Sequence, residues 1–208
     1  MSTTPSLPPT NRYRPGRSLL QHLKKGRLLE LGCGHGMYSI LAQQLGWSVT
    51  AVDARDARMP KTPGINWVVA DVRDYEITPH DCIAVFGLFY HLTFDDQVSL
   101  LRRSGHSITV IDTHFALRRA PQRWGLSKEV CYELDGETYS GKLYPEAKGR
   151  TIEEQQTSCN GSAWFNRESF WPYERDLLRM IAHVGGYKSV FKEQFQGAKD
   201  RAWFLCLP

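Results

Sequence analysis

The feature that most constrains the fold is a short apolar run, Arg27–Leu31, that leads directly into glycines at positions 32, 34 and 36. Glycine adopts backbone conformations that other residues avoid, and it lets a ligand approach the main chain without meeting a Cβ atom. The next segment, 37–45, places its apolar residues at helical spacing. This order predicts a strand, a tight loop and a helix whose N-terminal N–H groups are free to bind a ligand.

The alternation of apolar runs and helix-like segments continues on both sides of this loop. We predict helices at 18–25 and 95–103, and strands at 48–52, 65–70, 82–86 and 108–111. Strands that alternate with helices through short links predict a parallel sheet with helices on both faces, which is an α/β fold. Near-continuous apolar strands are typical of strands that are buried on both faces.

The C-terminal part of the chain predicts a helix followed by a hairpin. The helix is expected at 173–184, where apolar residues recur at helical spacing before two glycines end the pattern. Apolar segments at 187–195 and 201–207 follow and are joined by a short turn. We therefore expect these two segments to pair as antiparallel strands.

Two segments interrupt the regular pattern. Residues 113–169 form a long polar stretch with several glycines and aromatic residues. Loops of that length without secondary structure are uncommon in compact domains, so we expect an insertion that acts as a lid or shapes the substrate site, with a hairpin turn at Asp135–Gly136. The first fifteen residues are rich in Ser, Thr and Pro and predict a flexible leader. The length of 208 residues suits a single domain that includes both segments.

Composition bears on location and partners. No apolar run approaches the roughly 18 residues of a membrane-spanning helix, so no membrane is expected. The five cysteines are odd in number and none form a C-x-x-C pair, which favours a reduced, cytoplasmic protein without a bound metal. The net charge of +4 comes without a long Lys/Arg block, so a nucleic-acid partner is compatible with the sequence but not indicated by it.

Acidic residues follow two of the predicted strands. Asp53 comes after strand 48–52, and Asp71 comes after strand 65–70. In open α/β sheets ligands bind at the carboxyl ends of the strands, where an acidic residue after the second strand accepts hydrogen bonds from ribose hydroxyls. A carboxylate after the third strand is placed to accept a hydrogen bond from an adenine amino group. Together with the glycine loop, the two aspartates predict a site for an adenosine-containing cofactor.

These residues resemble the motifs of class I S-adenosylmethionine-dependent methyltransferases. The segment Leu29–Gly36 is similar to the first motif of that family, Asp53 matches its acidic residue after the second strand, and Ala70–Val72 matches its third-strand motif. Phe86–Leu92 resembles the segment after the fourth strand in many small-molecule and tRNA-modifying members. The resemblance covers about 27–112 and, more weakly, the C-terminal part of the chain.

The resemblance implies a Rossmann-like, seven-stranded, mostly parallel sheet that ends in an antiparallel hairpin, and S-adenosyl-L-methionine as the cofactor. It implies that Glu30 and Gly32 lie near the methionine portion, Asp53 at the ribose, and Asp71 and Val72 at the adenine. The full set of cofactor-binding candidates is Glu30, Gly32, Cys33, Gly34, Gly36, Asp53, Ala54, Asp71, Val72, Phe86 and Gly87.

A nicotinamide-dinucleotide site is the main alternative for the glycine loop. That fingerprint prefers the spacing G-x-G-x-x-G, whereas this chain has G-x-G-x-G. Glu30 precedes the loop, and its charge would oppose a pyrophosphate but can pair with the cationic amino group of S-adenosylmethionine. The spacing and the charge therefore favour methyl transfer over hydride transfer.

Methyl transfer to a hydroxyl needs a base that removes its proton. His91, Asp112 and His114 are the candidate bases because each lies at or just beyond the carboxyl end of a predicted strand. Each has a structural alternative, as a packing residue or as a partner of the backbone. Tyr90 and Tyr144 are candidate acceptor-binding residues, since aromatic rings can stack on a planar or sugar acceptor. The aromatic residues of the insertion could equally form a small core of their own.

Three functions are compatible with these features. The long aromatic insertion and modest charge favour an enzyme that methylates a hydroxyl or amine of a small molecule. The positive charge leaves a tRNA or other nucleic-acid methyltransferase as an alternative. A non-catalytic protein that only binds the cofactor is the third possibility. Neither the acceptor nor the oligomeric state follows from the sequence.

Overall fold

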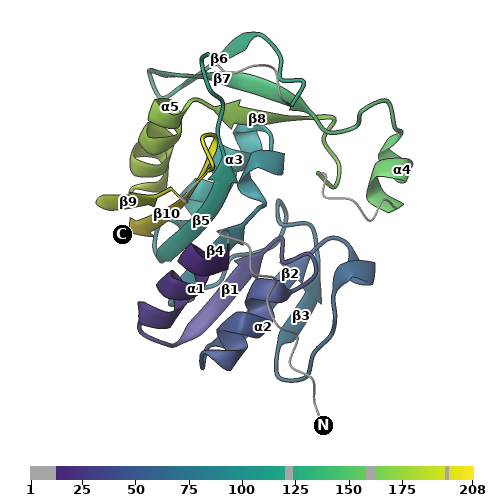
Figure 1. Ribbon diagram of the computed structural model, residues 1–208, viewed down its shortest axis with the longest axis vertical. Coiled ribbons are helices and arrows are strands. Elements are labelled where there is room, and N and C mark those ends of the chain that lie inside the picture. Colours follow the sequence, from purple (N-terminus) through teal and green to yellow (C-terminus); the bar gives the residue numbers. More distant parts are fainter. Residues whose placement is uncertain (1–12, 120–123, 158–162, 195–196) are drawn as a thin grey trace.

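The computed structural model describes residues 13–119, 124–157, 163–194 and 197–208. Its centre is a seven-stranded sheet in the order β3-β2-β1-β4-β5-β10-β9 (Figure 1). The strands are β1 (Arg27–Leu31), β2 (Ser48–Asp53), β3 (Asn66–Val69), β4 (Cys82–Phe86), β5 (Ile108–His114), β9 (Ser189–Glu193) and β10 (Arg201–Leu207). The first five are parallel, and β10 is antiparallel to both β5 and β9. The predicted α/β Rossmann-like sheet and its C-terminal antiparallel hairpin are confirmed.

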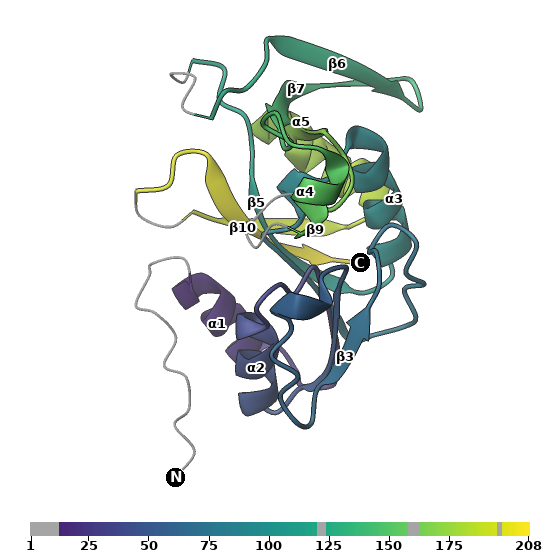
Figure 2. The same ribbon diagram turned by 90° about the vertical axis from the view of Figure 1, so that its right-hand side faces the viewer.

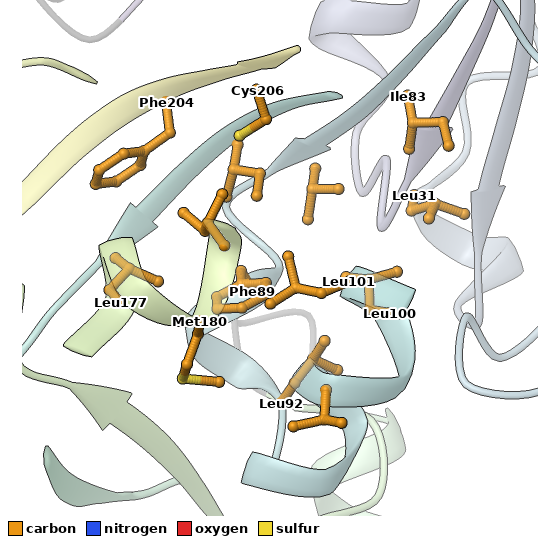
Figure 3. Close-up of a cluster of buried hydrophobic side chains, with 14 of the residues drawn as sticks. Leu31, Ile83, Phe89, Leu92, Leu100, Leu101, Leu177, Met180, Phe204 and Cys206 are labelled. Atoms are coloured by element: carbon orange, nitrogen blue, oxygen red, sulfur yellow. The ribbon is translucent and has the colours of Figure 1, made fainter. Parts of the chain in front are cut away.

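Helices cover both faces of this sheet because successive strand residues point to opposite sides. Leu28 and its neighbours in the alternating register pack against α1 (Tyr13–His22) and α2 (Met37–Gln44). Leu29, Leu31 and Ile83 pack on the opposite face, against α3 (Phe94–Ser104), α5 (Glu174–Arg179) and the π-helical segment η3 (Met180–Val184) (Figure 2). Figure 3 shows this second cluster, which includes Leu100 and Leu101 of α3 and Met180 of η3.

The first helix begins earlier than the sequence pattern indicates. We predicted a helix at 18–25, whereas α1 runs from Tyr13 to His22, so the last three residues of the expected leader are helical. Proline fits the first turn of a helix, and Pro15 and Gly16 are buried against the sheet. The indole N–H of Trp47 donates a hydrogen bond to the Leu20 carbonyl (3.0 Å), which fixes α1 beside α2. The rest of the expected leader, residues 1–12, lies outside the described residues.

The insertion is a second, three-stranded sheet in the order β6-β7-β8, with the short helix α4 between its last two strands. These elements are β6 (Glu129–Leu134), β7 (Glu137–Pro145), α4 (Ile152–Thr157) and β8 (Glu168–Pro172). The predicted hairpin turn is confirmed, since Asp135 and Gly136 both have positive φ (53° and 79°), as a type I′ turn requires. Strand β5 continues to His114, two residues into the segment that we expected to be the insertion.

The second sheet packs onto α3 at the carboxyl edge of the central sheet. The side-chain amide of Gln97 donates hydrogen bonds to the carbonyls of Phe89 (3.0 Å) and Phe170 (2.6 Å), and so joins the loop after β4 to β8. The rings of Phe94 and Tyr132 are stacked with their centroids 4.5 Å apart. The insertion is therefore a packed layer that closes one end of the molecule (Figure 1). In the part of the chain that the structure describes, no helix is long and apolar enough to cross a membrane.

Candidate active site

A cavity of about 280 Å³ lies at the carboxyl ends of β1, β2 and β4 and extends under the insertion. All the predicted cofactor-binding residues except Gly36 line it, as do the candidate base His91 and the candidate acceptor residue Tyr90. The lining further includes Tyr13, His35, Met37, Tyr38, Arg55, Arg58, Arg73, Leu88, Leu92 and residues 163–166. The strand ends of the central sheet thus supply one side of the cavity and the insertion supplies another.

The glycine loop exposes bare backbone to this cavity. Gly34 has a φ of 52°, and a Cβ atom placed on it would meet no atom within 4 Å. Its N–H donates to Oδ2 of Asp53 (2.8 Å), while the N–H of Arg55 donates to Oδ1 of the same carboxylate (2.8 Å). Gly36 differs, because a Cβ atom there would lie 2.4 Å from the indole of Trp67. Gly36 therefore serves the packing of the loop, whereas Gly34 leaves space for a ligand.

Glu30 places a carboxyl group in the floor of the cavity, where water hardly reaches it. The residue is 2% exposed and accepts a hydrogen bond from the hydroxyl of Ser39. Burial, reinforced by the nearby charge of Asp53, raises the pKa of Glu30 from 4.5 to about 8. A buried carboxyl group with a raised pKa is suited to a cationic ligand, because a positive charge would restore its ionised form.

Asp71 lies at the cavity wall but is already engaged by a neighbour. The guanidinium of Arg73 donates to both of its oxygens, with Nη2 at 2.5 Å from Oδ2 and Nε at 3.0 Å from Oδ1. Burial acts to raise the pKa of Asp71, and the hydrogen bonds and charge of Arg73 outweigh it and lower that pKa. The guanidinium also lies over the ring of Phe165, 5.0 Å from its centroid. The sequence did not single out Arg73, which ties this carboxylate to the insertion.

His91 meets a buried carboxylate from the insertion. It belongs to the 3₁₀ turn η2 (Phe89–His91) after β4, and its Nδ1 lies 2.7 Å from Oε1 of Glu146. The same oxygen accepts a hydrogen bond from the hydroxyl of Ser169 (2.8 Å), and Oε2 accepts one from the N–H of Ala163 (2.9 Å). Glu146 is 1% exposed. An ionised carboxylate that accepts from Nδ1–H fixes the tautomer of the ring and leaves Nε2 unprotonated. Within the described residues, Nε2 of His91 makes no hydrogen bond.

Asp112 and His114 lie outside the cavity lining, in a network around Arg201. Asp112 is fully buried, and its two oxygens accept from Nε and Nη2 of Arg201, both at 2.7 Å. Nε2 of His114 accepts from Nη1 of Arg201 (3.1 Å), and its Nδ1 donates to the carbonyl of Asp200 (3.1 Å). Burial, with the charge of Arg201, lowers the pKa of His114 to about 4. The acceptor atoms of both side chains are occupied, so neither offers a free base to a ligand in the cavity.

Tyr144 is likewise absent from the cavity lining. Its ring stacks on Trp171 with the centroids 5.2 Å apart, within a small aromatic cluster of the insertion. Tyr90 belongs to the border of this cluster but also lines the cavity. The sequence did not position Glu146, whose immediate neighbours are Pro145 and Ala147.

The order of the sheet, the glycine loop and the cavity at the strand ends together define the class I, Rossmann-like methyltransferases. The chain belongs to the methyltransferase-domain family, whose model matches residues 10–172. It is therefore an S-adenosylmethionine-dependent methyltransferase, as the glycine loop and the two aspartates indicate. No curated protein sequence matches the chain significantly.

Several solved structures share the fold. The N-terminal domain of EvdMO1 with S-adenosylhomocysteine bound has a TM-score of 0.66 at 19% identity, covering 96% of this chain and 81% of that one. A methyltransferase from Mesorhizobium loti has a TM-score of 0.63 at 15% identity, with coverage of 95% and 97%. The 1,6-didemethyltoxoflavin-N1-methyltransferase of Burkholderia thailandensis, with its acceptor and S-adenosylhomocysteine bound, has a TM-score of 0.59 at 14% identity, with coverage of 94% and 76%.

Proposed function

We propose that this enzyme transfers the methyl group of S-adenosylmethionine to a hydroxyl group of a small molecule, with His91 as the general base. The observation that carries the proposal is the hydrogen bond between Nδ1 of His91, which lines the cavity, and the buried carboxylate of Glu146. Glu146 would orient the imidazole and stabilise its positive charge once Nε2 has accepted the hydroxyl proton. An amine acceptor that is already neutral needs no such base, so the pair favours a hydroxyl.

The residues of the cavity fit the cofactor. Glu30 would hold the cationic amino group, since its buried carboxyl group has a raised pKa and lacks a cationic partner among the described residues. The bare backbone of Gly34 would lie against the cofactor, with Asp53 at the ribose and Asp71 and Val72 at the adenine. When bound, S-adenosylmethionine supplies a methyl group on a sulfonium, which is already activated. The chain then has to align the acceptor and exclude water.

The size and character of the cavity support a small acceptor. Its volume is about 280 Å³, and the cofactor would occupy much of it. The insertion closes over it with residues 163–166, whose side chains include Trp164 and Phe165. Tyr90 lies beside His91 with the ring centroids 4.3 Å apart, so it would contact an acceptor that reaches the base. The structurally similar N1-methyltransferase from B. thailandensis has 1,6-didemethyltoxoflavin and S-adenosylhomocysteine bound, which supports a small acceptor but not a particular acceptor atom.

The experiment that tests this proposal measures transfer of labelled methyl groups from S-adenosylmethionine to a panel of phenols and alcohols, each paired with the matching amine. We expect transfer to one or more hydroxyl compounds, and a fall of ~100-fold or more in His91→Gln, the range over which a general base acts. His106→Gln is the matched control, because His106 is exposed and does not line the cavity. Transfer to amines alone, or full turnover in His91→Gln, would reject the hydroxyl proposal.

A further inference from the structure

Arg55 connects the cofactor side of the cavity to the insertion. It lies two residues after the end of β2, and its backbone N–H donates to the carboxylate of Asp53 (2.8 Å). Its side chain runs across the cavity edge and is largely buried, with the residue 9% exposed. Nη2 donates to the carbonyls of Gln155 (3.1 Å) and Ala163 (3.0 Å), and Nε lies 3.3 Å from the carbonyl of Gln156. No sequence motif singles out this residue.

The same segment of the insertion also holds the carboxylate of the catalytic pair. Ala163 accepts from Arg55 at its carbonyl, and its N–H donates to Oε2 of Glu146 (2.9 Å). The side chain of Gln155 reinforces this position, since its amide donates to the Ala163 carbonyl (2.7 Å). The guanidinium of Arg55 lies over the indole of Trp164, 5.2 Å from the ring centroid. Arg55 therefore binds the carbonyl of Ala163, and the N–H of Ala163 binds the carboxylate of Glu146.

We propose that Arg55 is a positioning residue that fixes the His91–Glu146 pair from the cofactor side of the cavity. This inference rests on the proposed role of His91 as a base. Arg55 acts through Ala163, whose main chain sets the position of the Glu146 carboxylate, and Glu146 in turn orients the imidazole of His91. One connected set of hydrogen bonds thereby runs from the proposed ribose-binding carboxylate, Asp53, to the base.

The guanidinium group suits this role better than a neutral donor. Carbonyl oxygens that are buried without a donor are unfavourable, and a planar guanidinium can donate to several of them at once. Replacing Arg55 by Met keeps a long side chain beside Trp164 but removes the donors that Arg55 supplies to the three carbonyls, and the Ala163 carbonyl keeps only the side-chain amide of Gln155. The segment that contains Ala163 would then separate from β2 more often, and Glu146 would lose the main-chain donor to Oε2.

The test follows the ring proton on Nδ1 of His91 by nuclear magnetic resonance, in protein labelled with ¹⁵N-histidine and saturated with S-adenosylhomocysteine. The chain has seven histidines, and His91→Gln identifies the signal of this one. We expect a proton that is protected from exchange with water in the unmodified protein and lost in Glu146→Ala, which removes the acceptor of the Nδ1–H. In Arg55→Met we expect its exchange to be ~10-fold faster or more, because local opening near the pair becomes easier.

Two further variants make the result specific. Arg55→Lys keeps one charged donor and should give exchange between that of the unmodified protein and that of Arg55→Met. Arg73→Met is the matched control, because Arg73 joins the neighbouring strand end to the insertion through Asp71 and Phe165 and, within the described residues, makes no hydrogen bond to Ala163 or Glu146. Its His91 proton should exchange as in the unmodified protein. Unfolding curves and the affinity for S-adenosylhomocysteine are measured for each variant.

The proposal is overturned if Arg55→Met binds S-adenosylhomocysteine and leaves the exchange of the His91 proton unchanged. It is also overturned if Arg73→Met accelerates exchange as much as Arg55→Met does. Should Arg55→Met fail to fold, Arg55→Lys decides, and unchanged exchange in that variant rejects the role. The exchange experiment needs no methyl acceptor. Its result is therefore independent of the methyl-transfer assays, which test the proposed function.

Discussion

Nδ1 of His91 lies 2.7 Å from Oε1 of Glu146, although the two residues are 55 positions apart in the sequence. His91 comes from the short turn after β4 of the central sheet, and Glu146 directly follows β7 in the insertion. The pair forms only when the insertion is packed over the strand ends. The proposed base and the carboxylate that orients it therefore come from different parts of the chain, the central sheet and the insertion.

Replacing Glu146 should slow methyl transfer without abolishing cofactor binding. In Glu146→Gln the carbonyl oxygen can still accept from Nδ1–H, but the charge that stabilises a protonated His91 is lost. We expect turnover with a hydroxyl acceptor to fall ~10–100-fold, part of the contribution of a general base. Glu133→Gln is the control, since Glu133 is exposed on β6. Equal turnover in the two variants, measured with labelled cofactor, would contradict the role of Glu146.

Binding of the cofactor should release a proton from Glu30. The pKa of Glu30 is raised to about 8 in the free protein, so most molecules carry this proton at pH 7. The cationic amino group favours the ionised carboxylate, and affinity should rise with pH until about 8, by up to ~10-fold for each pH unit. Calorimetry with S-adenosylhomocysteine at pH 7, in two buffers of different ionisation enthalpy, counts the protons released.

Glu30→Gln is the control for this measurement. The amide is close to the carboxyl group in size and has no proton to lose, so its binding heat should be the same in both buffers after correction for dilution. Weaker binding is also expected, because the charge that faces the amino group is gone. A proton release of the same size in Glu30→Gln would show that another group is responsible.

Two glycines of one loop should respond differently to the same change. Gly34→Ala introduces a Cβ atom that meets no protein atom within 4 Å, so we expect a modest loss of stability, ~1–2 kcal/mol for the positive φ, and a clear loss of affinity for S-adenosylhomocysteine. Gly36→Ala places a Cβ atom 2.4 Å from the Trp67 indole and should lower stability more. Urea unfolding and calorimetry on both variants separate the two effects. If Gly34→Ala keeps full affinity, Gly34 does not lie against the cofactor.

The buried Asp112 should matter for stability. Its carboxylate makes two hydrogen bonds with Arg201, and Asp112→Asn would leave that guanidinium buried without a full counter-charge. We expect the free energy of unfolding to drop by ~3–5 kcal/mol, as for other buried pairs that lose one partner. Arg102→Gln breaks an exposed pair with Asp135 and should change it by less than ~1 kcal/mol. Similar small changes in both variants would contradict the structural role of Asp112.

Local patterns in the sequence were sufficient for most of the fold. The strand at 27–31, the glycine loop and the helix after it occur where predicted, because each depends on near neighbours and on backbone preferences. The Asp135–Gly136 hairpin is predictable for the same reason. The start of α1 was placed too late, since its first turn is polar and is fixed by packing of Gly16 against Trp203, a contact between distant parts of the chain.

The candidate site was only partly accessible to the same reasoning. Asp53 and Asp71 could be predicted because each follows a strand, and ligands of open α/β sheets bind at the carboxyl ends of the strands. The two arginines beside these aspartates, Arg55 and Arg73, could not be predicted. In the sequence they resemble ordinary surface residues, and only the structure shows that the insertion packs on them. Asp112 also ends a strand, yet its neighbour β10 brings Arg201 beside it and occupies both of its oxygens.

The division of the His91–Glu146 pair between two sheets has a consequence for protein engineering. Exchanging the β6–β8 insertion for that of a related enzyme is the obvious way to change acceptor preference, because the central sheet would keep its cofactor site. Such a graft would also remove the carboxylate at 146 and the Ser169 hydroxyl that supports it. The grafted insertion therefore has to place an acidic residue beside His91. Without one, the chimera would have a new acceptor site but no partner for the proposed base.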